Sequence, residues 1–254
     1  MRTILTSNCE VMGRWVGEHA AEDLRNAISE HGSANLVVAT GASQFEVLDA
    51  LVGQAGIDWT KVHGFHLDEY VGLSDEHPAS FCRYLRERFV DRVPLADFHY
   101  LNGVSDPADT ISQVGQVLAS RRIDVALVGI GENGHLAFND PPADFEAREP
   151  YLIVELDEPC RMQQVGEGWF GSLEEVPTHA ISMSVSQILR SSKIYCSVPD
   201  ERKSNAVRET IEGEIKPEVP ASILKSHPST TLIVDEAAAS KLSEAVMNSL
   251  ERVE

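Results

Sequence analysis

The segment Arg122–Ile130 constrains the fold of this chain most strongly. It reads Arg-Ile-Asp-Val-Ala-Leu-Val-Gly-Ile, so its second half is almost continuously apolar. A strand with one solvated face alternates apolar and polar residues, whereas a continuous apolar run is typical of a strand buried on both faces. Such strands occur in parallel sheets that helices cover on both sides. We therefore expect 122–130 to be a central strand of a parallel sheet.

The rest of the chain alternates between strand and helix patterns. Short apolar runs predict further strands at 35–40, 62–67, 194–198 and 231–234, and helical spacing of apolar residues predicts helices at 10–31, 43–52, 80–92, 201–212 and 236–252. This alternation indicates an α/β fold that is Rossmann-like, with a mostly parallel sheet and helices on both faces. No linker or internal repeat interrupts residues 1–254, so we expect one domain.

One segment lacks this regularity. Residues 141–177 are rich in proline, glycine and acidic side chains, and their apolar residues follow no clear period. Long irregular segments inside a compact domain are often functional loops. We expect this segment to form a long loop or a lid over a site.

Charge and cysteine content exclude several classes of partner. Acidic residues number 40 against 21 lysines and arginines, which gives a net charge of −19. Nucleic acids and anionic membranes are bound by clustered cations, so neither is expected as a partner. The cysteines are widely spaced and form no ligand pattern with histidine: Cys9, Cys82, Cys160 and Cys196. We expect reduced thiols, a cytoplasmic protein and no metal site.

Three strand ends carry residues suited to binding or chemistry, and ligands in open α/β sheets bind outside the carboxyl ends of strands. The first is the turn Thr40-Gly41-Ala42-Ser43, which leads into a predicted helix. Glycine allows close approach of the backbone to a ligand, and the hydroxyl groups can bind an anion. The alternative is an ordinary turn in which Ser43 caps the helix.

The second strand end is His66-Leu67-Asp68-Glu69, where two adjacent carboxylates follow an apolar strand. Burial and a neighbouring like charge raise the pKa of a carboxylate, which suits it to proton transfer. The alternative is a solvated acidic loop. Alternation along the strand would place Asp68 and Glu69 on opposite faces.

The third strand end is the glycine-rich loop Gly129–Pro141, directly after the strongest strand. The spacing of Gly129, Gly131 and Gly134 matches the bare dinucleotide-binding pattern. However, prolines follow at 141 and 142 where that motif requires a helix, so we do not expect a dinucleotide and predict no cofactor.

The same loop contains a histidine that is surrounded by hydrogen-bonding side chains. His135 has Asn133 on one side and Asp140 on the other. A neighbouring oxygen that fixes the tautomer of an imidazole prepares it for acid–base work. We therefore expect His135 to be functional. Lys203, near the start of the predicted helix 201–212, is a candidate ligand for a phosphate, the alternative being a solvated lysine.

Two sequence strings together resemble the glucosamine-6-phosphate deaminase (isomerase) family, which shares a superfamily with the 6-phosphogluconolactonases. These are Leu67-Asp-Glu-Tyr-Val-Gly-Leu73, followed by His77-Pro-Ala-Ser80, and Gly129-Ile-Gly-Glu-Asn-Gly-His-Leu-Ala-Phe-Asn-Asp-Pro141. The resemblance covers most of the chain. It implies conversion of an aminohexose 6-phosphate to a ketohexose 6-phosphate with release of ammonia and without a cofactor.

The resemblance also assigns roles to residues. It implies that Asp68 moves a proton between the second and first carbons of the sugar, that His135 assists ring opening, and that Lys203 and the turn 41–43 hold the phosphate. The complete expected set is Asp68, His135, Asp140 and Asn133 for catalysis, and Thr40, Gly41, Ala42, Ser43, Glu69, Gly134 and Lys203 for substrate binding.

The chain departs from the family at several positions. Asn133 replaces the usual aspartate and Asp140 the usual glutamate. A second phosphate-binding arginine has no evident counterpart, since the stretch Cys160–Phe170 carries only Arg161. The basic residues that bind an activator in some bacterial members are not recognisable around 143–151.

Two other functions stay open at this point. A lactonase is disfavoured because Ala137-Phe-Asn-Asp-Pro141 stands where lactonases have a different string after the histidine. A binding protein without activity is disfavoured because binding alone requires neither Asp68 nor His135. The resemblance implies a sugar phosphate as the small-molecule partner, and a homo-oligomer is compatible with the sequence.

Overall fold

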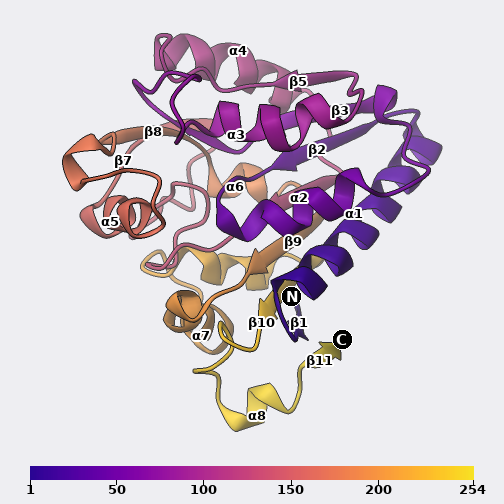
Figure 1. Ribbon diagram of the computed structural model, residues 1–254, viewed down its shortest axis with the longest axis vertical. Coiled ribbons are helices and arrows are strands. Elements are labelled where there is room, and N and C mark those ends of the chain that lie inside the picture. Colours follow the sequence, from indigo (N-terminus) through magenta and orange to yellow (C-terminus); the bar gives the residue numbers. More distant parts are fainter.

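Strand β6 (Val125–Val128) lies inside a sheet of eight strands, as the apolar run predicts. The computed structural model describes all residues from Met1 to Glu254 (Figure 1). Every adjacent pair of strands in this sheet is parallel. Across the sheet the order is β11 (Glu251–Val253), β1 (Arg2–Thr6), β10 (Thr230–Asp235), β9 (Lys193–Val198), β6, β2 (Ala34–Val38), β3 (Val62–His66) and β5 (Asp97–His99).

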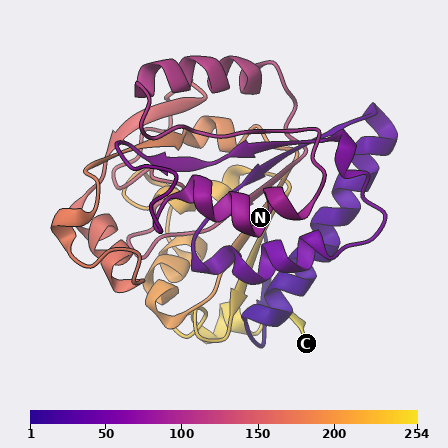
Figure 2. The same cartoon turned by 45° about the horizontal axis from the view of Figure 1, so that its top comes forward.

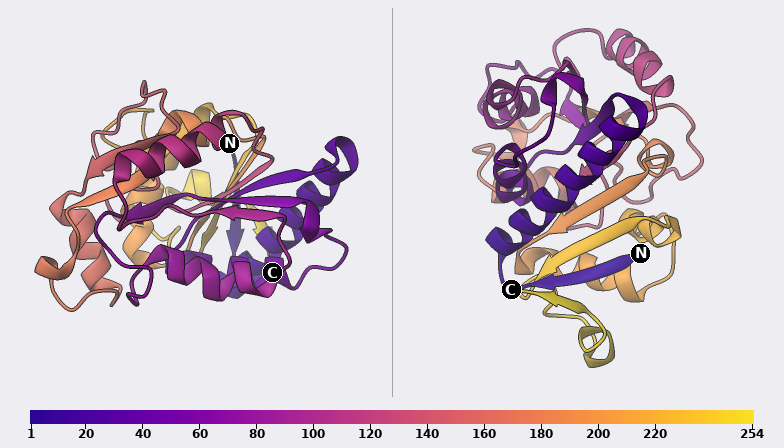
Figure 3. Two further views of the ribbon diagram at one scale, coloured as in Figure 1. Left: turned by 90° about the horizontal axis from the view of Figure 1, so that it is seen from above. Right: turned by 90° about the vertical axis from the view of Figure 1, so that its right-hand side faces the viewer.

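Helices cover both faces of this sheet, which confirms the predicted fold class (Figures 2 and 3). One face packs against α1 (Cys9–His31), α2 (Phe45–Val52) and α3 (Phe81–Arg88). The other packs against α4 (Pro107–Ala119), α6 (Val185–Ile188), α7 (Ser204–Glu212) and the 3-10 segment η6 (Pro220–Ser226). Successive residues of β2 and β6 contribute to opposite cores, so each of these strands is buried on both faces.

A second, smaller sheet stands beside the carboxyl ends of the main strands. It contains β4 (Asp68–Tyr70), β8 (His179–Met183) and β7 (Tyr151–Glu155), paired antiparallel in that order. The predicted loop or lid at 141–177 holds β7, α5 (Glu158–Gly166) and the 3-10 turn η4 (Leu173–Glu175). Figure 1 shows α5, β7 and β8 grouped at one end of the molecule. Movement of this segment as a lid stays a prediction.

The remaining short elements connect these parts. They are η1 (Ala42–Gln44), η2 (Trp59–Lys61), η3 (Val90–Arg92), η5 (Glu201–Lys203) and α8 (Glu244–Met247). Strands β1, β5, β7, β8 and β11 and helix α4 were not predicted. Four of these five strands lie at an edge of the main sheet or in the smaller sheet described above. Such strands are short, and their apolar residues show only a weak alternation in the sequence.

The predicted helix at 236–252 is wrong. This part of the chain forms turns, the four-residue helix α8 and strand β11 instead. Local side-chain hydrogen bonds compete with a continuous helix here, because Asp235 accepts from the backbone N–H of Ala238 and Ser243 caps α8 by accepting from Val246. Strand β11 then adds to the free edge of β1. No helix of the structure combines the length and apolar character needed to cross a bilayer.

Helices α1 and α2 meet at glycine, and this contact leads to a stability prediction. A Cβ atom added at Gly13 would lie 2.5 Å from the backbone carbonyl carbon of Glu46. We therefore expect Gly13→Ala to force the helices apart and to lower the free energy of unfolding by about 1–3 kcal/mol. Denaturant unfolding measures the loss. Gly166→Ala is the control, because a Cβ atom there meets open space; an equal loss in both variants would contradict the prediction.

Candidate active site

One cavity of the structure lies where the order of strands reverses. The chain proceeds from β2 through β3 to β5 on one side and from β6 through β9 to β10 on the other. A cavity of about 370 Å³ opens at the carboxyl ends of these strands, lined by residues that follow β2, β3, β6, β9 and β10. Ligands of open α/β sheets bind at such a switch point, and the volume suits a small molecule.

Asp68 begins β4 and faces this cavity. Its side chain is buried, and its Oδ1 atom has no hydrogen-bond partner in the protein. Burial, followed by the charge of Glu69, raises the pKa of Asp68 to about 8. A buried carboxyl group with a free oxygen on a cavity is available to a substrate, and its raised pKa makes the ionised form a stronger base.

Glu69 points away from the cavity, on the opposite side of β4 from Asp68. Its carboxylate accepts hydrogen bonds from the backbone N–H of Tyr70 in β4 and, at the start of α3, from the Ser80 hydroxyl and the backbone N–H groups of Phe81 and Cys82. The residue does not line the cavity. The expected contact between Glu69 and substrate therefore lacks support from the structure. Glu69 instead anchors α3 and acts on Asp68 through its charge.

His135 lies on the cavity with one ring nitrogen occupied by the protein. Its Nδ1 atom is 3.0 Å from Oδ1 of Asp140. Because an ionised carboxylate only accepts hydrogen bonds, Nδ1 carries a hydrogen and Nε2 is left for the cavity. Burial opposes ionisation of Asp140, but hydrogen bonds from His135, from Asn133 and from the backbone N–H of Asp157 outweigh it and lower the pKa of Asp140.

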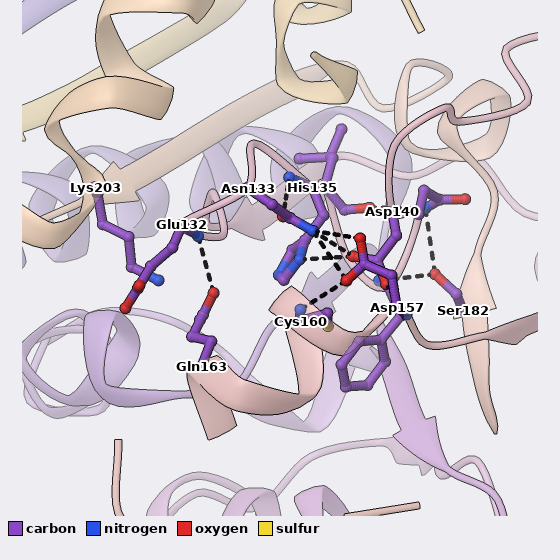
Figure 4. A network of polar contacts seen from close by, with 12 residues as sticks. Glu132, Asn133, His135, Asp140, Asp157, Cys160, Gln163, Ser182 and Lys203 are labelled. Atoms are coloured by element: carbon purple, nitrogen blue, oxygen red, sulfur yellow. Dashed lines mark hydrogen bonds and ion pairs between the residues drawn. The ribbon is translucent and has the colours of Figure 1, made fainter. Parts of the chain in front are cut away.

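Asn133 holds this arrangement together (Figure 4). Its Oδ1 accepts from the backbone N–H of His135 at 3.0 Å, and its Nδ2 donates to Asp140 at 2.9 Å. The same amide lies 3.3 Å from Asp157, the residue that caps α5. Asn133, Gly134 and Asp140 do not line the cavity. Asn133 and Asp140 are thus positioning residues behind His135, and they connect its loop to α5.

Gly131 explains why this loop needs glycine. A Cβ atom at this position would lie 2.3 Å from Nε2 of His135, inside the imidazole ring's contact distance. The absence of a side chain at Gly131 lets the imidazole pack closely against the loop backbone. This glycine therefore serves packing against the histidine, which needs no dinucleotide to explain it.

The hydrogen bond between Asp140 and His135 leads to a second prediction. An amide in place of the carboxylate can present either oxygen or nitrogen to Nδ1, so the tautomer and orientation of the ring are no longer fixed. We expect Asp140→Asn to lower kcat/KM about tenfold. This loss is smaller than the full contribution of a positioned acid–base group, because the imidazole itself is still present. Asp140→Glu, which keeps the charge, should restore most of the loss; no difference between the two variants would contradict a positioning role.

The turn after β2 lines the cavity as expected. Thr40, Gly41, Ala42 and Ser43 all reach it. Gly41 has a φ angle of 90°, a conformation that favours glycine. The alternative in which Ser43 caps a helix is wrong, because the residue before α2 is Gln44 and no side chain caps α2 or η1. The hydroxyl groups of this turn remain available for a ligand.

Lys203 ends η5 and reaches the cavity, where its ammonium group meets a carboxylate. Its Nζ atom is 3.4 Å from Oε1 of Glu167, and both side chains are only 9% exposed. Burial lowers the pKa of Lys203, while the charges of Glu167 and Glu132 oppose the shift. Arg202 also lines the cavity, but its guanidinium is paired with Asp200 at 2.8 Å.

Arg161 does not replace the missing arginine. Its Nη2 atom donates to the backbone carbonyls of Leu173 and Val176, which it ties to α5, and it does not line the cavity.

Of the predicted residues, the structure brings together Asp68, His135, Thr40, Gly41, Ala42, Ser43 and Lys203 on one cavity. Sequence reasoning missed Glu167, Gln163, Gln164, Arg202, Asp200 and Asp235, which also line it. Asp200 and Asp235 follow predicted strands, and that position is a signal that could have found them. The other four come from segments without a distinctive pattern.

Two clusters have the residue types of a metal site, but their atoms are already used. In the first, Nδ1 of His66 accepts from the backbone N–H of Leu101, and Glu69 accepts four hydrogen bonds. In the second, Asp140 is bonded to His135, and burial raises the pKa of Cys160 so that its thiol keeps its proton. Neither donor set fits a metal ion without breaking these contacts.

The fold and the cavity define an α/β protein with a buried carboxyl group and an oriented imidazole at a switch point of its sheet. The family model described as glucosamine-6-phosphate isomerases/6-phosphogluconolactonase matches residues 8–233. The chain belongs to this family.

Individual relatives agree. The chain is 34% identical over 249 residues to the glucosamine-6-phosphate deaminase of Clostridium acetobutylicum, covering 95% of this chain and 100% of the relative. It is 34% identical to the Oenococcus oeni protein of the same name over 229 residues, 90% and 94% of the two chains. A solved monomeric glucosamine-6-phosphate deaminase of the NagB superfamily superposes with a TM-score of 0.85 at 28% identity, covering 94% and 99%. The 6-phosphogluconolactonase of Trypanosoma brucei, at 14% identity and a TM-score of 0.77, shares the fold.

Proposed function

We propose that this protein converts glucosamine 6-phosphate and water to fructose 6-phosphate and ammonia, in the manner of the deaminases it is similar to. The observation that carries the proposal is the placement of Asp68 and His135 on one cavity. An aldose–ketose shift needs one group that moves a proton between neighbouring carbons and one that acts at the ring oxygen. The two side chains supply these groups from separate strand ends.

Ring opening is assigned to His135. The cyclic sugar opens when a proton is delivered to the ring oxygen and another leaves the hydroxyl on the first carbon. Because Asp140 accepts a hydrogen bond from Nδ1–H, the Nε2 atom is the one that exchanges protons with the sugar. It accepts the proton of the hydroxyl on the first carbon and delivers a proton to the ring oxygen. The imidazole is unchanged at the end of this step, and the product is the open-chain aldehyde.

Proton transfer between carbons is assigned to Asp68. Its ionised form takes the proton from the second carbon while the aldehyde oxygen gains a proton, which leaves an enolamine, and Asp68 then returns its proton to the first carbon. The Asp68 carboxyl group lines the cavity and its buried Oδ1 atom has no hydrogen-bond partner in the protein, so no protein contact of that atom has to be broken when the group reacts. The amino group gives up a proton as the first carbon gains one, which balances the proton gained by the aldehyde oxygen, and the nitrogen is then an imine on the second carbon. Water adds to that carbon, the carbon–nitrogen bond breaks, and ammonia leaves with ketose as product.

The phosphate is assigned to Lys203 and the turn at 40–43, which lie on the same cavity. A net charge of −19 repels an anion at long range, so these local groups have to bind it. We place the reaction in the cytoplasm, a proposal that the four unpaired cysteines support. The carbon–nitrogen cleavage makes the overall reaction hydrolytic.

One assay tests the proposed function. The protein is incubated separately with glucosamine 6-phosphate, galactosamine 6-phosphate and 6-phosphogluconolactone, and ammonia, ketose phosphate and acid are measured. We expect ammonia and fructose 6-phosphate in equal amounts from the first. Rapid acid release from the lactone with no ammonia from either amino sugar would replace the proposal with lactonase activity.

A further inference from the structure

The carboxylate of Glu167 occupies the cationic end of the cavity. It contacts Nζ of Lys203, the cation assigned to the phosphate. The other cation on the cavity, Arg202, is turned to Asp200. The lining contains five carboxyl side chains and two cations: Glu46, Asp68, Glu167, Asp200 and Asp235 against Arg202 and Lys203. Even without Asp68, whose raised pKa leaves it mostly protonated at neutral pH, four carboxylates face two cations, and the field inside the cavity does not favour a dianion.

Protein contacts fix the Glu167 carboxylate in this place. Its Oε1 atom accepts from Nε2 of Gln163 at 2.8 Å, and its Oε2 atom accepts from Nε1 of Trp169 at 3.2 Å. Gln163 is itself oriented, because its Oε1 accepts from the backbone N–H of Glu132 at 2.8 Å. Figure 4 shows Gln163 below Glu132, on the same side of the network as Lys203. A carboxylate held by these donors is a prepared part of the cavity.

A phosphate on Lys203 would have to share that lysine with Glu167. Two negative groups on one buried ammonium repel each other strongly, because screening by water is weak in such a place. A hydroxyl group meets no such repulsion, since it can donate to Glu167 and accept from Lys203. The pair is thus better matched to an alcohol than to a phosphate.

We propose that Glu167 is a specificity-determining residue that weakens selection for a phosphate at the sixth carbon, so that the enzyme also deaminates aminohexoses bearing a free hydroxyl there. This inference rests on the proposed function. It deepens that function by naming a second substrate class, the unphosphorylated aminohexose, and the residue that admits it.

The test compares glucosamine 6-phosphate with glucosamine in the wild-type protein, in Glu167→Gln and in Glu155→Gln. Glu155 is an exposed glutamate at the end of β7, so its change removes the same charge away from the cavity. Ammonia release gives kcat and KM for each sugar. Calorimetric titration with inorganic phosphate gives a binding constant that does not depend on turnover.

We expect Glu167→Gln to lower the KM for glucosamine 6-phosphate and the Kd for inorganic phosphate about tenfold, equivalent to about 1.4 kcal/mol. The kcat of Glu167→Gln should stay within about twofold of the wild-type kcat, because the variant binds the substrate and the transition state more tightly by the same amount. The KM of this variant for glucosamine should not fall. Glu155→Gln should match the wild type. Circular dichroism and thermal unfolding confirm that each variant is folded.

Two results would overturn the inference. One is a Glu167→Gln variant that binds phosphate no better than the wild type. The other is a wild-type kcat/KM for glucosamine more than about 1,000-fold below that for the phosphate ester, a selectivity typical of sites that require the missing group. Failure of the proposed function is distinct from either: no ammonia would form from any amino sugar, while the phosphate titration would still report on Glu167.

Discussion

Replacing Asp68 by asparagine should lower kcat for ammonia release about 10⁴-fold, the upper end of what a positioned acid–base group contributes. The amide has nearly the same shape but cannot take a proton from carbon. Since Asp68 Oδ1 has no partner in the protein, the substitution breaks no internal hydrogen bond of that atom, and the variant should fold. The binding constant for fructose 6-phosphate should change little, because the phosphate and hydroxyl contacts remain.

A mechanistic readout separates this effect from a general disturbance of the site. In deuterium oxide the wild-type protein should introduce deuterium at the first carbon of fructose 6-phosphate, and Asp68→Asn should not. Asp68→Glu serves as a comparison that keeps the carboxyl group. Exchange at an unchanged rate in Asp68→Asn would remove the residue from the reaction.

The pH dependence of kcat/KM should identify the same group. Burial and the charge of Glu69 raise the pKa of Asp68 to about 8, so below that pH the group is mostly protonated and cannot act as a base. We expect kcat/KM to rise about tenfold for each pH unit between about pH 6 and 7 and to level off above about pH 8. Glu69→Gln removes the neighbouring charge and should move this rise to lower pH. An unchanged profile in that variant would show that the rise belongs to another group.

The second large effect is expected at His135. His135→Gln keeps a hydrogen-bonding side chain but loses the ability to carry a proton, and kcat should fall about 10³-fold. The loss should fall on ring opening. The variant should therefore bind an open-chain analogue such as 2-amino-2-deoxyglucitol 6-phosphate within about threefold of the wild-type Kd, a difference of about 0.6 kcal/mol.

A comparison with Asp140 separates proton transfer from ring position. Asp140→Asn leaves the imidazole in place and should cost much less than His135→Gln. If the two variants lost activity equally, the imidazole would depend wholly on the Asp140 carboxylate. Retention of wild-type kcat by His135→Gln would transfer ring opening to another group.

The strand–helix alternation was sufficient to predict the class of fold, and continuous apolar runs located its central strands. Those runs are informative because a strand buried on both faces carries few polar side chains, each of which needs a hydrogen-bond partner. The edge strands β5 and β11 lack this constraint and were not found, and β1, which lies next to β11, was also missed. The last helix was wrong because Ser243 and Asp235 bind nearby backbone groups, a local competition that apolar spacing does not reveal.

The residues of the candidate site also fall into two groups, those that the sequence predicted and those whose role only the tertiary structure decided. Asp68, His135 and the turn at 40–43 were predicted because they follow strands, and parallel strands end at one edge of a sheet. The roles of Glu69 and Glu167 were decided by tertiary structure. The sequence placed Glu69 on the opposite face of the strand from Asp68 and gave it a role in substrate binding, whereas in the folded chain its carboxylate binds the start of α3.

By itself, the sequence determined where the reacting groups would gather, since burial and strand direction are written in local patterns. Only the folded chain decided which charges meet, because Glu167 and Lys203 lie 36 residues apart and come into contact through the packing of α5 against the cavity. Electrostatic interactions depend on distance in space and on exclusion of water, and neither quantity is encoded in residue spacing.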